Sequence, residues 1–208
     1  MYRENCGKGK EAQKVILELK MDNKFIRLSR YMGNERVYTP IQRHTDVVIK
    51  ITERDFPPRI GDAVITNLKN FEIGVRTADC VPIVILGEDW VGVIHAGWKG
   101  LMKKIIRKTV EELKKYEKGK LKAFIFPAAK SCCYEVGNEF KEIFSRNLVN
   151  RDNKLYFDTQ EEAKYQLLKE GIEDLFIWEK CTVCSDELPS YRRDKTKSRI
   201  LTSVKIEG

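Results

Sequence analysis

The chain contains only two histidines, and each stands where an apolar run meets a predicted loop. His44 lies in QRHTDVV, directly ahead of such a run, and His95 follows the run WVGVI and precedes AGWKG. Rigid strand ends beside adaptable loops are places where binding and catalytic side chains concentrate. Either histidine alone is equally well explained as a structural imidazole, so a functional prediction needs a further ligand.

Cys80, in RTADCVPIVIL, is the candidate for that ligand. An aspartate beside a cysteine, close to a proline, is poorly explained by packing, because a strand that crosses a core favours apolar residues. The alternative is a cysteine that serves as a small buried hydrophobic residue. Two imidazoles and a thiolate suit zinc or copper, and three protein ligands leave a position for water or substrate. We therefore predict one metal site formed by His44, Cys80 and His95, with Zn²⁺ favoured and Cu²⁺ as the alternative.

The turn AGWKG predicts a sharp passage from a strand into a helix. Gly97 and Gly100 let the backbone turn, and amide groups at a helix N-terminus can face an anion such as phosphate. Lys99 would add positive charge there. A plain strand-to-helix turn explains the same glycines.

The elements that must position these residues are predicted to be mainly strands. Residues 15–96 hold apolar, β-branched runs and almost no helical periodicity, which predicts a first half made mainly of sheet. The runs are VILEL, KFIRLSRYM, VYTPIQRHTDVVIKI, DAVITN, EIGVRT, VPIVIL and WVGVIHA.

The second half alternates helices with strands. Helical spacing of apolar residues predicts one helix over about 101–116 and another that begins near Tyr134. A capping box of Asp158 and Glu161 starts a third helix, which Gly171 ends. Predicted strands cover 122–127, 174–180 and 199–206.

This order of elements predicts the fold class. Many strands followed by helices interleaved with strands favour an α+β or mixed α/β layered sandwich over a doubly wound sheet. The 208 residues show no repeat and no linker, so we expect a single domain over 1–208, with about residues 1–14 as a mobile terminus.

Charge and hydropathy narrow the class of protein. The formal charge of +8 is spread among acidic residues, as on a solvated surface, although it would favour anionic ligands. No segment is long and apolar enough for a membrane span, and the charged start of the chain has no signal-peptide pattern. We expect a cytoplasmic protein without a membrane partner, and leave its oligomeric state open.

The remaining cysteines are expected to be mostly reduced thiols in that compartment. Cys181 and Cys184 form CTVC, for which structural thiols, a disulfide and a second metal site are alternatives. A metal would need two more ligands, and the adjacent Cys132 and Cys133 lack chelating spacing. Cys6 supports no prediction.

Several motifs together resemble a known family. They are QRH at 42–44, DAVIT at 62–66, TADCVP at 77–82, HAGWKG at 95–100, FPAAKSCCYEVG at 126–137, LYFD at 155–158, CT at 181–182 and YRRDKTKSR at 191–199. Over residues 24–206 the chain resembles the YfiH or laccase-domain family, also described as polyphenol oxidase-like proteins and as purine nucleoside phosphorylases.

The resemblance implies a fold, a metal site and an activity. The fold would be a layered α/β structure grouped with the cytotoxic necrotizing factor catalytic domain. The metal ligands would be the histidine of QRH, the cysteine of TADC and the histidine of HAGW, which are His44, Cys80 and His95. The implied reaction converts adenosine, inosine or methylthioadenosine and phosphate into a free base and ribose 1-phosphate, with adenosine deamination as a second reaction.

Within that activity, several residues are candidates for roles beyond metal binding. Asp79 could manage a proton, although on an extended segment it would point away from Cys80, and Asp62 is a rival. For phosphate, the candidates are Lys99, Arg76, Arg192 and Arg193. The motifs depart from the family pattern at three positions: Lys99 replaces an arginine, Phe126 a glycine and Tyr191 a histidine.

Three other functions compete with this hypothesis. Cys80 with His95 or His44 could form a cysteine hydrolase. A single copper could oxidise phenols, whereas two histidines do not provide the ligands of several copper centres. The basic segment YRRDKTKSR could bind nucleic acid, but it lacks interleaved aromatic residues for base stacking, so this alternative is disfavoured.

Overall fold

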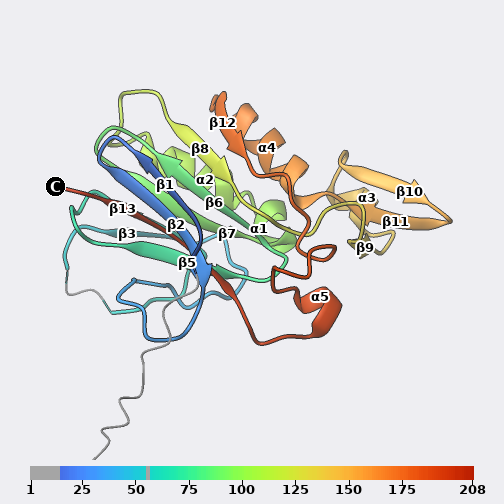
Figure 1. The fold of residues 1–208 in the computed structure, drawn as a ribbon. Helices are drawn as coiled ribbons and strands as arrows, with labels where there is room; N and C mark the ends of the chain where they lie inside the picture. The colour runs from blue at the N-terminus through green and yellow to red at the C-terminus, as the bar shows by residue number, and fades with distance from the viewer. Residues whose placement is uncertain (1–14, 55–56) are drawn as a thin grey trace, which may run out of the picture.

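Two β-sheets lie against each other in the computed structural model, which describes residues 15–54 and 57–208 (Figure 1). The four-stranded sheet is antiparallel and has the order β1 (Val15–Met21), β2 (Lys24–Arg30), β13 (Ile200–Ile206) and β5 (Ile73–Thr77). The six-stranded sheet is mixed and has the order β12 (Asp174–Ile177), β8 (Lys122–Ile125), β6 (Val81–Leu86), β7 (Val91–Ala96), β4 (Ala63–Thr66) and β3 (Val48–Ile51). The predicted terminus at 1–14 and Cys6 lie outside the described residues.

The central strands of the six-stranded sheet, β4, β6 and β7, are buried on both faces. In β6, Val84 packs toward the four-stranded sheet, whereas Ile83 and Ile85 pack in the core beneath the helices. Strands covered on both sides need apolar residues at every position, which explains why VPIVIL has no polar alternation. The resulting order of sheet, sheet and helices confirms the prediction of a mixed α/β layered fold.

Helices α1 (Trp98–Met102), α2 (Ile105–Leu113) and α4 (Thr159–Lys169) cover the outer face of the six-stranded sheet. The single helix predicted over about 101–116 is therefore wrong, because Lys104 adopts a left-handed backbone with φ of 63° and separates α1 from α2. The predicted capping box is confirmed at its first residue: the Asp158 carboxylate accepts hydrogen bonds from the amides of Gln160 and Glu161.

The segment between β8 and α4 differs most from the prediction. A helix beginning near Tyr134 is wrong, since the chain forms β9 (Glu135–Val136), the single-turn α3 (Phe140–Ile143), β10 (Leu148–Arg151) and β11 (Lys154–Phe157). The three strands form a small antiparallel sheet, which extends with α3 from one end of the larger sheets (Figure 1). The short α5 (Tyr191–Asp194) precedes β13. Among the described residues, no helix is long and apolar enough to cross a membrane.

Candidate metal centre

Strand register brings three polar residues to one end of the six-stranded sheet. In the pairing of β4 with β7, Ala63 faces Ile94, so the preceding Asp62 lies beside His95, whose amide donates to the Asp62 carbonyl at 2.7 Å. In the pairing of β6 with β7, Pro82 faces His95, which places Cys80 just beyond the start of β6 at the same end. These positions follow from hydrogen bonding between neighbouring strands.

Asp62 organises the loop that carries His44. Its fully buried carboxylate accepts hydrogen bonds from the amides of Arg43, His44 and Thr45 at 3.1, 3.1 and 2.6 Å, and from Oγ1 of Thr45 at 2.7 Å. His44 has a φ of 56°, which is uncommon outside glycine and persists only where its surroundings hold it. The same carboxylate contacts Nδ1 of His95 at 2.7 Å. Asp62 therefore positions both histidines.

The side chains of His44, Cys80 and His95 converge, with their potential ligand atoms all within 4.8 Å of one another. Sγ of Cys80 lies 3.7 Å from Nε2 of His44, and the two imidazole centroids are 4.8 Å apart. Tetrahedral zinc, with ordinary bonds to sulfur and nitrogen, separates two such ligands by about 3.6 Å. The cluster therefore has the donor types and the spacing to hold one such metal ion.

The charges within the cluster support one another. Burial by itself raises the pKa of the Cys80 thiol, but the charge of His95 and hydrogen bonds with both histidines outweigh burial and lower the pKa from 9.0 to about 6. Burial lowers the pKa of His95, but Cys80 and Asp62 together raise it to about 9. For Asp62, burial is outweighed by hydrogen bonds from His95 and Thr45, which hold its pKa well below the usual range. The interactions within the cluster thus favour the thiolate form of Cys80 and the protonated form of His95.

Gly97 leaves the room that this cluster needs. A Cβ at position 97 would lie 2.9 Å from Sγ of Cys80 and 2.9 Å from Cδ2 of His44, closer than real side chains approach. The backbone of Gly97 is extended with φ of −76°, so steric space rather than backbone freedom is the reason for glycine. The helix that follows has only five residues, so the predicted anion site at its N-terminus has little support.

A cavity of about 860 Å³ opens over the cluster. Six cations line it, namely Arg76, Lys99, Arg192, Lys195, Lys197 and Arg199, together with the aromatic residues Tyr31, Trp98, Tyr134 and Tyr191. Among the described residues that line the cavity, Asp79 is the single carboxylate. The cavity therefore has the positive charge expected for binding an anion and the aromatic rings expected for binding a planar group.

Arg76 is one of the predicted phosphate ligands that line the cavity. Its guanidinium lies over the Tyr31 ring at 5.1 Å, and its backbone is fixed by two hydrogen bonds with the Gln42 side chain. Nε of Arg76 is buried and has no hydrogen-bond partner among the described residues. Lys99 is exposed, with its ammonium 5.5 Å from the centre of the Trp98 ring.

Arg192 also borders the cavity, where it contacts Tyr134 and Asp79. Its guanidinium lies 4.9 Å from the centre of the Tyr134 ring. Its amide donates to Oδ2 of Asp79 at 2.6 Å, and Oγ1 of Thr182 donates to Oδ1 of Asp79 at 2.7 Å. Both carboxylate oxygens of Asp79 are thereby engaged, an arrangement that suits positioning of the segment around Arg192 better than proton transfer.

The structure does not bring Arg193 to the cavity. Its guanidinium instead donates to the backbone carbonyls of Thr182, Val183, Ser185 and Leu188 at 2.8 to 3.2 Å. Phe126 does not line the cavity either. It is fully buried in the core between the two larger sheets and packs near Phe124 and Phe176. Its replacement of a glycine therefore bears on the core rather than on the cavity surface.

Three cavity cations were missed as ligands in the sequence. Lys195, Lys197 and Arg199 belong to YRRDKTKSR, a family motif in which the sequence indicates only Arg192 and Arg193 as phosphate candidates. Their spacing of two residues is the signal, because alternate residues of an extended segment point to the same side. The family motif at 191–199 therefore contributes to the same cavity as the metal ligands.

Comparisons with known proteins identify the family of the chain. Residues 18–207 match the family model described as multi-copper polyphenol oxidoreductase laccase. A purine nucleoside phosphorylase of Aquifex aeolicus is 59% identical over 206 residues, which cover 99% of each chain. The purine nucleoside phosphorylase YfiH of Escherichia coli is 30% identical over 173 residues, covering 78% of this chain and 71% of the relative.

The fold has solved counterparts as well. The crystal structure of a Bacillus licheniformis hypothetical protein YfiH superposes with a TM-score of 0.84 at 20% identity, covering 95% of this chain and 98% of the other. That likeness supports the fold, and the match along the sequence supports the family. The chain belongs to the family of the multi-copper polyphenol oxidoreductase laccase model, in which the relatives from Aquifex aeolicus and Escherichia coli are named purine nucleoside phosphorylases.

Proposed function

We propose that this chain is a metal-dependent purine nucleoside phosphorylase that acts on adenosine, inosine and methylthioadenosine. The observation that carries the proposal is the joining of three metal-binding side chains and six cations in one cavity. A nucleoside alone is neutral and does not require such a field, whereas its co-substrate phosphate does. The names of the relatives support the same substrate class.

The cations hold phosphate in this proposal. Arg76, Lys99 and Arg192 provide positive charge at the cavity wall. A phosphate oxygen attacks C1′ of the ribose, the bond from C1′ to the purine nitrogen breaks, and its electron pair leaves with the base. The base takes up a proton and is released with ribose 1-phosphate.

The aromatic residues hold the base. Trp98, Tyr134 and Tyr191 present rings to the cavity, and a purine stacks on such rings without requiring a specific hydrogen-bond pattern. His44, Cys80 and His95 would hold a zinc ion at the base of the cavity. When bound, that ion supplies Lewis-acid polarisation to the substrate group that faces it. We assign adenosine deamination to the same site as a second reaction.

The test is a product assay on the purified, zinc-loaded chain. Adenosine, inosine and methylthioadenosine are each incubated with and without phosphate, and bases, nucleosides and ribose 1-phosphate are separated by chromatography. Phosphate-dependent release of base supports phosphorolysis, and phosphate-independent formation of inosine from adenosine supports deamination. Absence of turnover for all three nucleosides with zinc bound would contradict the proposal.

One observation favours a second candidate. Cys80 has a lowered pKa and lies beside an imidazole, as the nucleophile of a cysteine hydrolase does. Metal content separates the two candidates. A metal-free protein that is alkylated selectively at Cys80 supports the hydrolase, whereas zinc that is lost in both His44→Ala and His95→Ala supports the metal site.

A further inference from the structure

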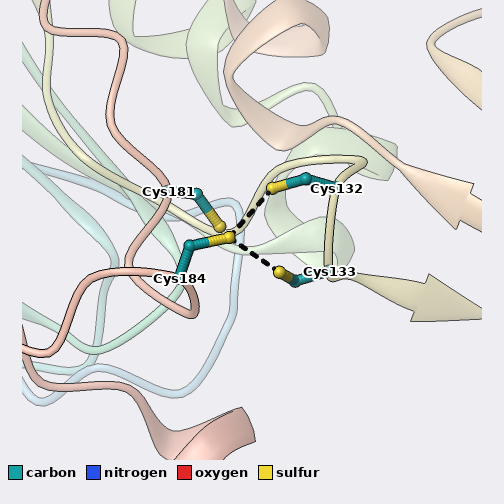
Figure 2. A group of neighbouring side chains, drawn as sticks. All are labelled: Cys132, Cys133, Cys181 and Cys184. Carbon is teal, nitrogen blue, oxygen red and sulfur yellow. Dashed lines mark hydrogen bonds between the residues drawn. The ribbon is translucent and has the colours of Figure 1, made fainter.

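Four cysteines converge in a second cluster, separate from the candidate metal centre. The sulfur atoms of Cys132, Cys133, Cys181 and Cys184 all lie within 4.8 Å of one another. Figure 2 shows the four side chains directed toward a common centre. Sγ of Cys184 lies 2.8 Å from Sγ of Cys133 and 3.3 Å from Sγ of Cys132. The expectation that Cys132 and Cys133 could not join CTVC is therefore wrong.

The main chain holds the two segments together independently of sulfur. Ala128 and Cys181 form a parallel bridge, and the amide of Thr182 donates to the Ala128 carbonyl at 3.0 Å. The amide of Cys133 donates to the Lys130 carbonyl at 3.0 Å, which closes a turn between β8 and β9. That turn delivers two adjacent sulfurs to the same side. Backbone hydrogen bonds thus hold the two cysteine segments together without requiring a disulfide or a bound ion.

Packing does not explain the cluster. Cys132 and Cys184 are exposed, Cys133 is partly buried, and Cys181 alone is buried. A cysteine acts as a small hydrophobic residue only where its sulfur is removed from water. Disulfides would account for sulfurs in pairs, but they do not require four sulfurs from two segments to meet at one point.

We propose that Cys132, Cys133, Cys181 and Cys184 bind one structural zinc ion through four thiolates. Zinc bound tetrahedrally by sulfur holds its ligands about 3.8 Å apart, within the span that these four atoms already occupy. The CTVC segment has the two-residue separation of a zinc half-site. A four-iron cluster needs a wider frame, because each thiolate binds a different iron at a corner of a cube.

The surroundings offset the negative charge of such a site. Arg151 donates to the Cys132 carbonyl at 3.0 Å, which holds its guanidinium at the cluster. Arg193 donates to the carbonyls of Thr182 and Val183 at 3.0 and 3.2 Å, inside the CTVC loop. Four thiolates around one divalent ion carry two net negative charges, and the Arg151 guanidinium lies where it offsets part of that charge, whereas the charge of Arg193 is paired with Asp194. The hydrogen bonds from Arg193 thus support the CTVC loop that carries Cys181 and Cys184.

An ion bound by these four cysteines would also stabilise the wall of the cavity over the candidate metal centre. Thr182, between the two cysteines of CTVC, donates from Oγ1 to Asp79 at 2.7 Å. Asp79 directly precedes Cys80, and its carbonyl accepts from the amide of Ala129 at 2.8 Å. The ion joins the segment 130–133 to the segment 181–184 on either side of these contacts. Its role is structural because all four of its positions are filled by protein.

The test compares metal content across matched variants of the full chain by elemental analysis. Cys184→Ser and Cys132→Ser are expected to lose one zinc per chain, whereas Cys6→Ser keeps it. The double variant His44→Ala/His95→Ala keeps the cluster ion, so failure of the candidate centre and failure of this proposal give different results. In cobalt-substituted protein, intense charge-transfer absorption of a four-thiolate site should vanish in Cys184→Ser and persist in the histidine variant.

A labelling experiment on the unaltered protein covers variants that do not fold. Iodoacetamide should leave the four cysteines unmodified in zinc-loaded protein and should modify all four after chelation, as read by peptide mass spectrometry. Equal labelling with and without zinc overturns the proposal. Recovery of the four residues as disulfides in protein purified under reducing conditions, or unchanged zinc content in Cys184→Ser and Cys132→Ser, overturns it as well.

Discussion

The Asp62 carboxylate lies 2.7 Å from Nδ1 of His95 at the base of the cavity. A carboxylate at this site is an acceptor, so Nδ1 carries the proton and Nε2 is the nitrogen left to bind a metal. A carboxylate behind a ligating histidine fixes the tautomer and orientation of the ring. The same carboxylate accepts hydrogen bonds from three backbone amides around His44 and so holds that loop in place.

Replacing Asp62 by asparagine should weaken metal binding at this site about 10- to 100-fold, because the amide cannot hold His95 and the His44 loop as a carboxylate does. The measurement is the zinc retained against increasing chelator, corrected for the zinc that His44→Ala/His95→Ala retains. Asp174→Asn is the control, since Asp174 is an exposed ion-pair partner of Lys122 far from the cluster in sequence and strand order. Equal retention in Asp62→Asn and the unaltered protein would show that this carboxylate does not support the site.

Gly97→Ala should cost about 100-fold in kcat/KM, because a methyl group at this position displaces Cys80 or His44. The fold should survive, as the backbone of Gly97 is accessible to alanine. Circular dichroism and steady-state kinetics with a nucleoside and phosphate check both expectations. Gly119→Ala is the matched control, since the nearest atom to its added methyl group is 3.8 Å away. An active Gly97→Ala enzyme with its full zinc content is the contrary outcome.

Substitutions at Lys99 should act on phosphate more than on the nucleoside. Lys99→Ala should raise the KM for phosphate about tenfold. Lys99→Arg should have a KM for phosphate equal to or below that of the unaltered protein, because a guanidinium binds phosphate with two parallel hydrogen bonds. Initial rates are measured with each substrate varied in turn. A change that falls equally on the KM of the nucleoside would assign Lys99 to the base or the ribose.

Arg76→Ala should raise the KM for phosphate more, by about 10- to 100-fold, because its guanidinium lines the cavity and is held over the Tyr31 ring. Part of the loss should be absent in Arg76→Lys, which keeps the charge. Gln42→Ala tests whether the position of Arg76 matters as well as its charge, because the Gln42 side chain fixes the backbone of Arg76 through two hydrogen bonds. A smaller rise in the KM for phosphate is expected in this variant than in Arg76→Ala. An unchanged KM for phosphate in Arg76→Ala would remove this residue from the phosphate site.

Arg193→Ala should lower the free energy of unfolding and leave the KM for phosphate unchanged, because its guanidinium donates to four backbone carbonyls and pairs with Asp194 outside the cavity. Urea unfolding monitored by tryptophan fluorescence measures the loss. Arg107→Ala is the control, as exposed Arg107 pairs with the exposed Glu111 on its own helix. A raised KM for phosphate with unchanged stability would place Arg193 in the cavity after all.

The parts of the fold that sequence predicted depend on local signals. Asp158 caps α4 because its carboxylate reaches amides two and three residues ahead, a pattern visible in the sequence. The break at Lys104 has no such signal, since a lysine in a left-handed conformation is enforced by packing of α1 and α2 on the sheet. The hairpin of β10 and β11 turns at Asp152 and Asn153, both with positive φ, rather than at the glycine that marks most such turns.

The candidate site shows the same division. Residue types and loop positions were enough to select His44, Cys80 and His95 as a group, and the structure brings them together. The distinction between Arg192 and Arg193 was not accessible, because neighbours in sequence point to different sides of a short helix. The adjacent spacing of Cys132 and Cys133 does not predict chelation, since no local rule shows that a distant turn meets CTVC.

The pairing of β13 has a consequence for how the protein is made. β13 lies between β2 and β5, so the middle of the four-stranded sheet is missing until residues 200–206 emerge from the ribosome. Lys195, Lys197 and Arg199, directly ahead of it, reach the cavity at the same late stage. A nascent chain that has not yet released residues 200–206 therefore exposes the unpaired hydrogen-bonding edge of β2, and this wall of the cavity is assembled only through a long-range pairing that folds slowly.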